Sequence, residues 1–420
     1  MDIFVYIYLP GQTEAVPAGI FEYDPDQSLG MFRYGNRYRQ RKDAVPVDPI
    51  ALPLGGNIKT CETNSGLYGA FRDASPDMWG RLVTAKALKV PPESLNEGEY
   101  LLHSSGLRVG NLDFRSSPKF PEPEHTVPTL RDIDELIDAA SRIRNDQPVD
   151  QEILQLFLHG SSLGGARPKC VIQDQGSLWI AKFPDVQDRW NHARVEWATM
   201  LLAKKSGVNV PEMRIMSTEM GDVLLSGRFD RENAANGFSR HGYLSALSVL
   251  QLDERDRDRF SYLTLADAIR KHGIGDQNTL EQLFRRMAFN VFCRNTDDHP
   301  RNHGVLYKGR FADLSPAFDI TPTPSRAGVG QDFFLSMSIG PQGRLANLEN
   351  LQTGAPRFGL DSQKANDILL EIAERITEWK SLYSDCGISQ KDSDLFRSTF
   401  DSRIAEEVQE LGNQPNLRSS

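Results

Sequence analysis

The sequence predicts an α+β protein in which a β-rich N-terminal part precedes a helical C-terminal part. Short runs of β-branched and aromatic residues dominate the first part, and from about residue 250 onward apolar residues recur at the spacing of amphipathic helices. With 420 residues, 39% of them hydrophobic, the chain is long enough to form two or three domains, each with its own core.

Composition restricts the class of protein. No apolar run reaches the roughly 18 residues that a membrane span needs, and the start of the chain lacks the basic and apolar pattern of a signal peptide. A net charge of −9 argues against broad, sequence-independent contact with nucleic acid. The four cysteines are dispersed and form no C-x-x-C pair: Cys61, Cys170, Cys293 and Cys386. These features predict a cytoplasmic protein without disulfides or cysteine metal sites.

The N-terminal part is expected to begin with strands, followed by a helix. Three strands are predicted from β-branched and aromatic residues, over residues 2–8, 19–24 and 31–34. A helical pattern follows near residues 76–83, where Ser75 suits the N-cap position and Pro76 the first helical position. Three prolines within residues 116–124 then predict a linker.

A helix opens the next part, because apolar residues recur at helical spacing after Thr129. A glycine-rich segment at residues 160–169 leads into two strands, the second over residues 178–183, which are joined by an Asp-Gln-Gly-Ser turn. Residues 191–206 have the pattern of a helix that ends at Gly207. Helical periodicity dominates the rest of the chain.

The most informative stretch is Arg294–His303, which directly follows a helical apolar segment. Asp297 and Asn302 are five residues apart, and Pro300 between them predicts a loop. Another acid, Asp319, follows an apolar run seventeen residues after Asn302. A carboxylate in such a loop can accept the proton of an acceptor hydroxyl, while an amide oxygen and a second acid can hold Mg²⁺. The spacing therefore predicts phosphoryl transfer from ATP.

Two features upstream supply parts that this reaction needs. Lys182 closes the strand 178–183 on the side of Leu178 and Ile180, where an ammonium group needs an anionic partner such as the ATP phosphates. The glycine-rich segment lets backbone amides approach phosphate oxygens, although it lacks the G-x-x-x-x-G-K-[ST] spacing. Either feature alone is also compatible with an ordinary strand edge or turn.

A second interpretation uses the same loop differently. His299 and His303 have the separation of a zinc-binding pair, and with Asp297 and Asp298 they would form a phosphohydrolase site for zinc or manganese. That geometry requires a helix, and Pro300 interrupts one, so we expect the imidazoles to bond to loop carbonyls or carboxylates. The hydrolase interpretation also leaves the strand lysine and the glycine-rich segment without a role.

Together these residues resemble the HipA family, the serine/threonine-kinase toxins of bacterial type II toxin–antitoxin systems. The resemblance covers most of the chain, and its most specific motifs are Thr296–His303 and Ser315–Asp319. The other motifs follow in the family's order: Phe32–Tyr34, Asp73–Gly80, Gly110–Arg115, Ser161–Lys169, Ala181–Phe183 and Arg228–Arg231.

The resemblance implies a two-lobed, protein-kinase-like fold with a β-rich N-terminal subdomain and an all-helical C-terminal lobe. It also implies ATP and Mg²⁺ as cofactors. The expected divisions are an N-terminal subdomain at 1–117, a linker at 118–128, a nucleotide-binding lobe at 129–245, a helical lobe with the catalytic and metal-binding segments at 246–412, and a tail at 413–420.

Individual residues also receive roles from the resemblance. Asp297 would be the catalytic base, and Asn302 and Asp319 would contact the nucleotide and hold Mg²⁺. The other nucleotide-binding residues would be Lys182, Ser162, Gly164, Gly165, Arg228, Phe229 and Asp230. Ser162, or Ser161 beside it, would be the loop serine that such kinases autophosphorylate.

Partners are implied in the same way. They are a helix-turn-helix antitoxin of the HipB type, which also binds operator DNA, and a protein substrate, an aminoacyl-tRNA synthetase whose phosphorylation arrests translation. One departure from the family affects the adenine edge of the nucleotide, where relatives often carry a glutamate and this chain has Gly227. A non-catalytic corepressor bound to the antitoxin is the remaining alternative, and the intact set of candidate catalytic residues argues against it.

Overall fold

The computed structural model describes residues 1–104, 106–119, 127–160, 165–325 and 332–412. The chain divides into two compact units, each assembled from separate segments. Unit 1 contains Met1–Gln187, Glu212–Glu254 and Val305–Ala312, and unit 2 contains Asp188–Pro211, Arg255–Gly304 and the chain from Asp313 onward. This grouping differs from the predicted divisions, because residues 188–211 of the expected nucleotide-binding lobe belong to unit 2, and residues 246–254 and 305–312 of the expected helical lobe belong to unit 1. Residues 120–126 of the predicted linker and the predicted tail lie outside the described residues.

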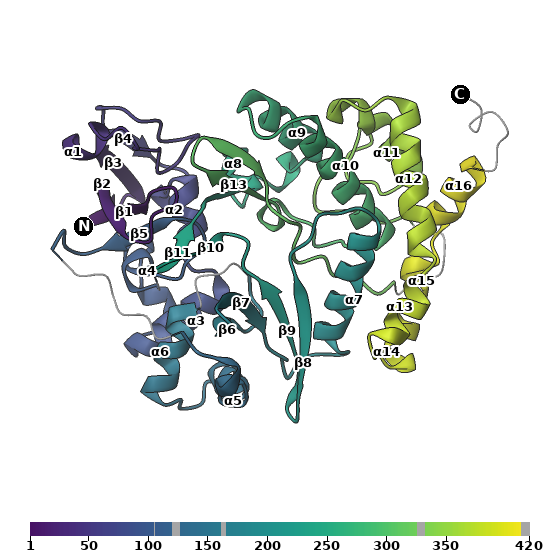
Figure 1. Ribbon diagram of the computed structural model, residues 1–420, viewed down its shortest axis with the longest axis horizontal. Helices are drawn as coiled ribbons and strands as arrows, with labels where there is room; N and C mark the ends of the chain where they lie inside the picture. The colour runs from purple at the N-terminus through teal and green to yellow at the C-terminus, as the bar shows by residue number, and fades with distance from the viewer. Residues whose placement is uncertain (105, 120–126, 161–164, 326–331, 413–420) are drawn as a thin grey trace. The chain divides into compact units, whose positions relative to one another are not determined.

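Unit 1 carries the two larger sheets, both antiparallel (Figure 1). The first has the strand order β4 (Lys59–Cys61), β3 (Leu29–Tyr34), β2 (Ala15–Asp24), β1 (Asp2–Tyr8) and β5 (Leu112–Arg115). The second has the order β6 (Lys169–Asp174), β7 (Ser177–Lys182), β9 (Gly221–Gly227) and β8 (Met213–Thr218). The strands predicted near the N-terminus and on both sides of the Asp-Gln-Gly-Ser turn are therefore confirmed.

Two smaller sheets complete the strands of the described chain. They are the hairpin of β10 (Arg231–Ala234) and β11 (Gly237–Arg240), and a three-stranded sheet ordered β12 (Gly242–Ser245), β13 (Gly304–Lys308) and β14 (Phe311–Leu314). The helices of unit 1 are α1 (Asn36–Arg39), α2 (Gly69–Ala74), α3 (Met78–Leu88), α4 (Glu97–His103), α5 (Ile133–Arg144), α6 (Gln151–Gly160) and α8 (Ala246–Val249).

The predicted helix near residue 76 begins two residues later than expected. Asp77, and not Ser75, occupies the N-cap position of α3, and the Asp77 carboxylate does not cap its own helix. Its oxygens instead accept a hydrogen bond from the Gly165 backbone N–H at 2.8 Å and pair with Arg72 at 3.3 Å. Ser75 instead ends helix α2, where its backbone N–H donates to the Phe71 backbone oxygen at 2.9 Å, so the N-cap prediction was wrong.

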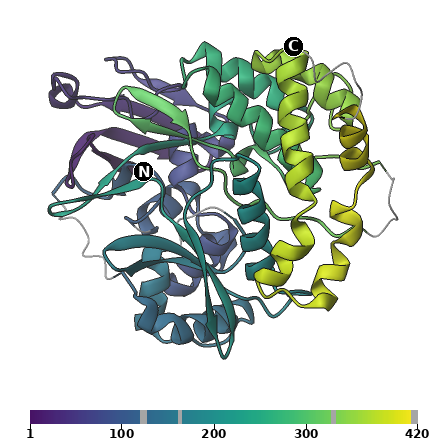
Figure 2. The ribbon, with the colours of Figure 1, turned by 45° about the vertical axis from the view of Figure 1, so that its right-hand side comes forward.

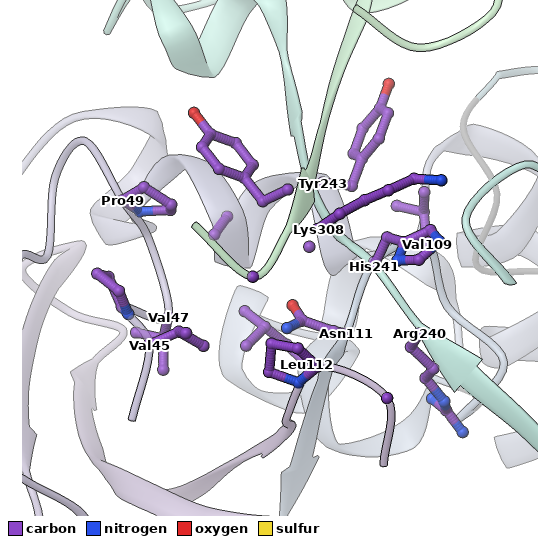
Figure 3. A pocket seen from close by; sticks show the side chains of 18 of the residues that line it. Val45, Val47, Pro49, Val109, Asn111, Leu112, Arg240, His241, Tyr243 and Lys308 are labelled. Carbon is purple, nitrogen blue, oxygen red and sulfur yellow. The ribbon is translucent and has the colours of Figure 1, made fainter. Parts of the chain in front are cut away.

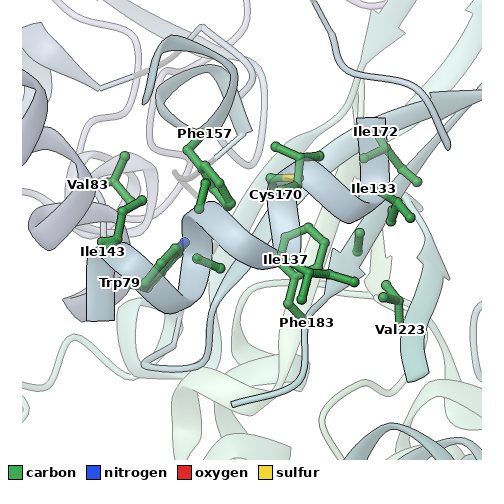
Figure 4. Packing of buried hydrophobic residues seen from close by; sticks show 14 of the residues in the cluster. Trp79, Val83, Ile133, Ile137, Ile143, Phe157, Cys170, Ile172, Phe183 and Val223 are labelled. Atoms are coloured by element: carbon green, nitrogen blue, oxygen red, sulfur yellow. The ribbon is translucent and has the colours of Figure 1, made fainter. Parts of the chain in front are cut away.

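One face of the β6–β7–β9–β8 sheet is covered by α3, α5 and α6, which builds the core around it (Figure 4). Cys170 and Ile172 of β6 and Ala181 of β7 point into this core. Trp79 of α3 is fully buried there, and its indole N–H donates to the backbone oxygen of Lys169 at 2.9 Å. Because side chains alternate along a strand, Lys182 lies on the opposite face of the sheet, as the sequence predicted.

Unit 2 is helical. Its helices are α7 (His192–Lys205), α9 (Tyr262–Lys271), α10 (Gln277–Phe292), α11 (Leu348–Gly354), α12 (Ser362–Ile376), α13 (Trp379–Asp385), α14 (Gln390–Leu395), α15 (Arg397–Phe400) and α16 (Arg403–Gly412). The α12 helix packs against α10 and α16, drawn from green to yellow in Figure 2. Gly207 adopts a left-handed φ of +78° just after α7 and ends it, as predicted. Within the described parts of the chain, no helix is both long and apolar enough to cross a membrane.

Candidate functional site

The loop that follows α10 is held in a defined conformation. Cys293 ends the helix, and Arg294 adopts a left-handed φ of +51°, which few residues other than glycine tolerate. The next backbone N–H, that of Asn295, donates back to the oxygen of Asn290 at 2.9 Å. The chain therefore turns sharply off the helix axis, and Pro300 then starts a short 3-10 turn at Pro300–Asn302. The predicted loop is confirmed.

Asp297 and Asn302 meet across this loop. The Asn302 side chain is buried, and its amide nitrogen donates to the backbone oxygen of Asp297 at 3.2 Å. The His299 backbone N–H donates to the same oxygen at 2.9 Å. Because the amide nitrogen faces Asp297, the Asn302 Oδ1 atom points to the other side of the planar amide group. The loop therefore fixes the Asn302 side-chain oxygen, a possible metal ligand, relative to Asp297.

Asp319 brings a second carboxylate to the same place. It has a left-handed φ of +61°, which aspartate adopts more often than most other residues apart from glycine. Two residues earlier, the Ala317 backbone N–H donates to the oxygen of Asn209 at 2.7 Å and anchors the segment within unit 2. The charge of Asp319 acts on Asp297, so these two acids and Asn302 form one cluster in unit 2.

The electrostatics of this cluster favour proton acceptance. Partial loss of hydration raises the pKa of the Asp297 carboxyl, His299 opposes this, and the charges of Asp319 and Asp298 raise the pKa further. The Asp297 side chain still reaches solvent, so a substrate hydroxyl can approach it. A carboxylate whose pKa is raised above its ordinary value is a better general base near neutral pH.

The donor set suits a hard cation. Mg²⁺ prefers oxygen ligands and takes one or two carboxylates together with substrate phosphates, and Asn302 and Asp319 offer one amide oxygen and one carboxylate. Within the described residues there is no group of three or more His, Cys, Asp or Glu side chains arranged to hold a metal ion. His303 does not face a metal position with its Nε2 atom, because that atom bonds to the Asp298 carboxylate at 2.7 Å.

In unit 1, Lys182 has a second lysine directly opposite it. In the β6–β7 register Lys169 pairs with Lys182, so both side chains lie on the sheet face that the core helices do not cover. Lys169 is 4% exposed, and its Nζ atom lies beside Gly165, where an added Cβ atom would stand 2.7 Å from it. The register therefore places two ammonium groups on the same face of this sheet.

Gly165 is the described end of the predicted glycine-rich loop. Its φ of +108° is accessible to glycine and strained for any other residue. Its backbone is held from both sides, because its N–H donates to the Asp77 carboxylate and its oxygen accepts from the Trp79 backbone N–H at 3.4 Å. The other predicted loop residues, Ser161, Ser162 and Gly164, lie outside the described residues.

Arg228 and Asp230 sit in a buried ionic network of unit 1. The Arg228 guanidinium donates to Asp230 at 2.9 and 2.8 Å and to the backbone oxygen of Leu107 at 2.6 Å. Asp230 also accepts from Arg231 at 2.7 Å and from the Gly110 N–H at 2.9 Å. Burial alone would raise the pKa of Asp230, but the two guanidinium groups lower it far below its ordinary range. These side chains join the segment after strand β9 to residues 107–110, which precede strand β5. A nucleotide contact by Arg228, Phe229 or Asp230 stays a prediction.

Unit 1 also contains a cavity of about 220 Å³ (Figure 3). Val47 and Leu112 contribute to its apolar wall. At its polar side Glu232 contacts His241 at 2.9 Å and Lys308 at 3.0 Å. The described residues that line it include none of the predicted site residues. The cavity is therefore separate from the residues to which the sequence assigns chemistry.

The structure thus assembles the predicted residues in two groups. The first group is the cluster of Asp297, Asn302 and Asp319 in unit 2. The second group contains Lys182 and Gly165, which both belong to unit 1. Lys169 was noted in the sequence only as a basic residue beside the glycine-rich segment, and its place opposite Lys182 follows from the strand register.

The chain combines a β-rich unit with a helical unit, and an acid and an amide lie on the loop after the buried helix α10. This arrangement is that of a two-lobed, protein-kinase-like α+β fold. The model of the HipA-like C-terminal domain family matches residues 161–380, more than half of the chain. The chain belongs to this family, as the sequence motifs predicted.

A solved structure agrees with this fold. A structure from Shewanella oneidensis MR-1 of the toxin–antitoxin system HipA, HipB and its operator DNA matches with a TM-score of 0.67 and 17% identity, covering 96% of this chain and 99% of that chain. The proinflammatory kinase CtkA of Helicobacter pylori matches with a TM-score of 0.45 and 16% identity, covering 58% of this chain and 95% of that chain. The search of curated proteins found no match.

Proposed function

We propose that this chain is an ATP- and Mg²⁺-dependent serine/threonine protein kinase that acts as a HipA-type toxin. The observation that carries the proposal is the cluster of Asp297, Asn302 and Asp319, with the Asn302 amide bonded to the Asp297 backbone and the two acids within electrostatic reach. Phosphoryl transfer needs positioning and charge stabilisation around a base, and these residue types supply both.

Asp297 has the role of general base. Its carboxylate accepts the proton of a serine or threonine hydroxyl while that oxygen forms a bond to the γ-phosphorus of ATP and the bond to the ADP oxygen breaks. The raised pKa of Asp297 increases its affinity for this proton. Asn302 and Asp319 are the residues that would hold Mg²⁺, which when bound neutralises the charge of the phosphates.

Lys182 and Lys169 are the residues of unit 1 that we propose as contacts for the nucleotide phosphates. They lie on one face of the sheet, and the Lys169 ammonium group lies beside Gly165. Ammonium groups and loop amides are common phosphate ligands, and a strand lysine with this role is typical of kinases. Phosphorylation of Ser162 or Ser161 would add negative charge to the glycine-rich loop and would regulate the enzyme.

The proposed partners follow from family membership. The Shewanella structure contains HipA with HipB and operator DNA, which supports a HipB-like antitoxin as partner of this chain. As the substrate we propose an aminoacyl-tRNA synthetase, whose phosphorylation would inhibit translation. DNA would be reached only through the antitoxin.

The test is phosphoryl transfer by the Asp297→Asn variant. Purified chain is incubated with bacterial lysate and γ-labelled ATP, and modified serines and threonines are identified by mass spectrometry. The wild type should label protein, and Asp297→Asn should do so about 10²–10⁴-fold more slowly, because a positioned base contributes this factor. The matched control is Asp385→Asn, an exposed acid at the end of α13 in the same unit, which should label at the wild-type rate. Undiminished labelling by Asp297→Asn would end the assignment.

A further inference from the structure

The loop that carries Asp297 and Asn302 rests on a chain of buried hydrogen bonds that the proposed chemistry does not itself use. Four of its members are at most 1% exposed: Tyr262, Asn290, Asp298 and His303. They come from the start of α9, from α10 and from both sides of Pro300, so the chain links two helices to the loop. All four belong to unit 2.

Asp298 is the centre of this chain. Its Oδ2 atom accepts a hydrogen bond from the Tyr262 hydroxyl, and its Oδ1 atom lies 2.7 Å from the His303 Nε2 atom. A carboxylate is an acceptor only, so both neighbours must donate to it, which assigns the His303 proton to Nε2. The Tyr262 ring also packs edge-on against the His303 imidazole, with 5.1 Å between ring centroids.

The hydrogen bonds continue from Tyr262 back to the beginning of the loop. The Asn290 amide nitrogen donates to the Tyr262 hydroxyl at 3.0 Å, and the Asn290 amide oxygen accepts from Asn295 at 3.1 Å. The hydrogen bonds of this chain have consistent donors and acceptors, whereas the buried Nδ1 atom of His303 has no hydrogen-bond partner among the described residues. Linked buried hydrogen bonds restrict the side chains that they join.

Two members of the network are sequence neighbours of the functional residues. Asp298 directly follows Asp297, and His303 directly follows Asn302, so the two ends of the Asp298–His303 contact lie next to the base and the amide. Fixing Asp298 and His303 together fixes the backbone at both positions. The Asn302 amide then reaches the Asp297 backbone oxygen at 3.2 Å only with the loop in this form.

Resting on the proposed kinase function, we infer that Asp298 is a positioning residue, which acts through Tyr262 and His303 to hold Asp297 and Asn302 in their reactive arrangement. It touches neither substrate nor nucleotide. A displacement of about 1 Å in a reacting group can cost on the order of 10²-fold in rate, and loss of an outer-sphere hydrogen bond around a metal site typically costs about 10–100-fold. The effect is expected on turnover at saturating ATP.

The chain offers a matched pair of variants to test this inference. Tyr262→Phe removes the hydroxyl that joins Asn290 to Asp298. Tyr383→Phe removes an equally buried hydroxyl of the same unit, which bonds to Thr199 at 3.0 Å outside the network. For each variant we would measure the rate of protein labelling from γ-labelled ATP, the ATP concentration at half-saturation, and the unfolding midpoint.

Both variants should lose similar stability, whereas only Tyr262→Phe should lose about 10–100-fold in labelling rate, with half-saturation by ATP unchanged within about threefold. A second pair covers the case in which Tyr262→Phe does not fold. His303→Gln keeps an amide N–H near the Nε2 position and should label at least about tenfold faster than His303→Ala.

The outcomes separate the two hypotheses. Equal labelling rates for Tyr262→Phe and Tyr383→Phe, or equal rates for the two His303 variants, overturn the positioning role and leave the kinase function standing. A wild type that transfers no phosphate to protein overturns the proposed function and the positioning role with it.

Discussion

Asp230→Asn is expected to destabilise the folded protein strongly and to change nucleotide affinity little. The Asp230 carboxylate is buried and receives hydrogen bonds from Arg228, Arg231 and the Gly110 N–H at distances between 2.7 and 2.9 Å. Asparagine has the same shape but lacks the charge, and so it leaves two buried guanidinium groups without their counter-ion.

The size of this effect follows from the burial. Removing one partner of a buried ion pair costs about 3–5 kcal/mol, because the remaining charge stays desolvated. With a urea dependence near 3 kcal/mol/M, the unfolding midpoint should fall by between about 1 and 2 M. The control is Asp43→Asn, which breaks an exposed ion pair with Arg41 in the same unit and should leave the midpoint almost unchanged.

The pH dependence gives a second measurement of the same carboxylate. The pKa of Asp230 is lowered in the folded state, so its stabilisation is complete above the ordinary value near 3.8 and is lost as the pH falls below that value. The difference between wild type and Asp230→Asn should therefore be constant near neutrality and shrink below about pH 4. A variant with wild-type stability but greatly weakened ATP binding would refute this reasoning and assign Asp230 to the nucleotide.

Two further variants test other parts of the account. Lys182→Met should lower kcat/KM for ATP by about 10²-fold, since one cationic contact to the phosphates is lost, whereas the exposed Lys42→Met should match wild type in the same kinetic assay. Gly30→Ala should destabilise the N-terminal sheet by about 1–3 kcal/mol in urea unfolding, because its Cβ would stand 2.0 Å from the Gly66 oxygen. At Gly35 the nearest atom would be 3.7 Å away, so equal stabilities for Gly30→Ala and Gly35→Ala would contradict the packing described.

Local features could be predicted well from the sequence. The first strand matches β1 at both ends, and the helix that stops at Gly207 matches α7, because β-branched runs and terminating glycines act over a few residues. The Asp297–Asn302 spacing also predicted a loop correctly, since Pro300 excludes a continuous helix whatever surrounds it.

What the sequence did not reveal depends on contacts between distant segments. The arginines of the Arg228–Asp230 network donate hydrogen bonds to backbone oxygens of residues 107–110, more than a hundred residues earlier in the chain. No local sequence pattern predicts such a contact. That Lys169 lies opposite Lys182 could be known only from the register of strands β6 and β7. The Ser75 cap failed because helix α2 ends at this residue, and the distant Gly165 holds the Asp77 carboxylate that follows it.

The most direct test of the central claim is the fate of the γ-phosphate. The wild-type chain is incubated with γ-labelled ATP, Mg²⁺ and bacterial lysate, and label in protein serines and threonines is compared with label released as free phosphate. A kinase built on Asp297, Asn302 and Asp319 places the label in protein, and the Asp297→Asn variant loses that signal. Release of all the label as free phosphate, with none in protein, would contradict the account and indicate a hydrolase.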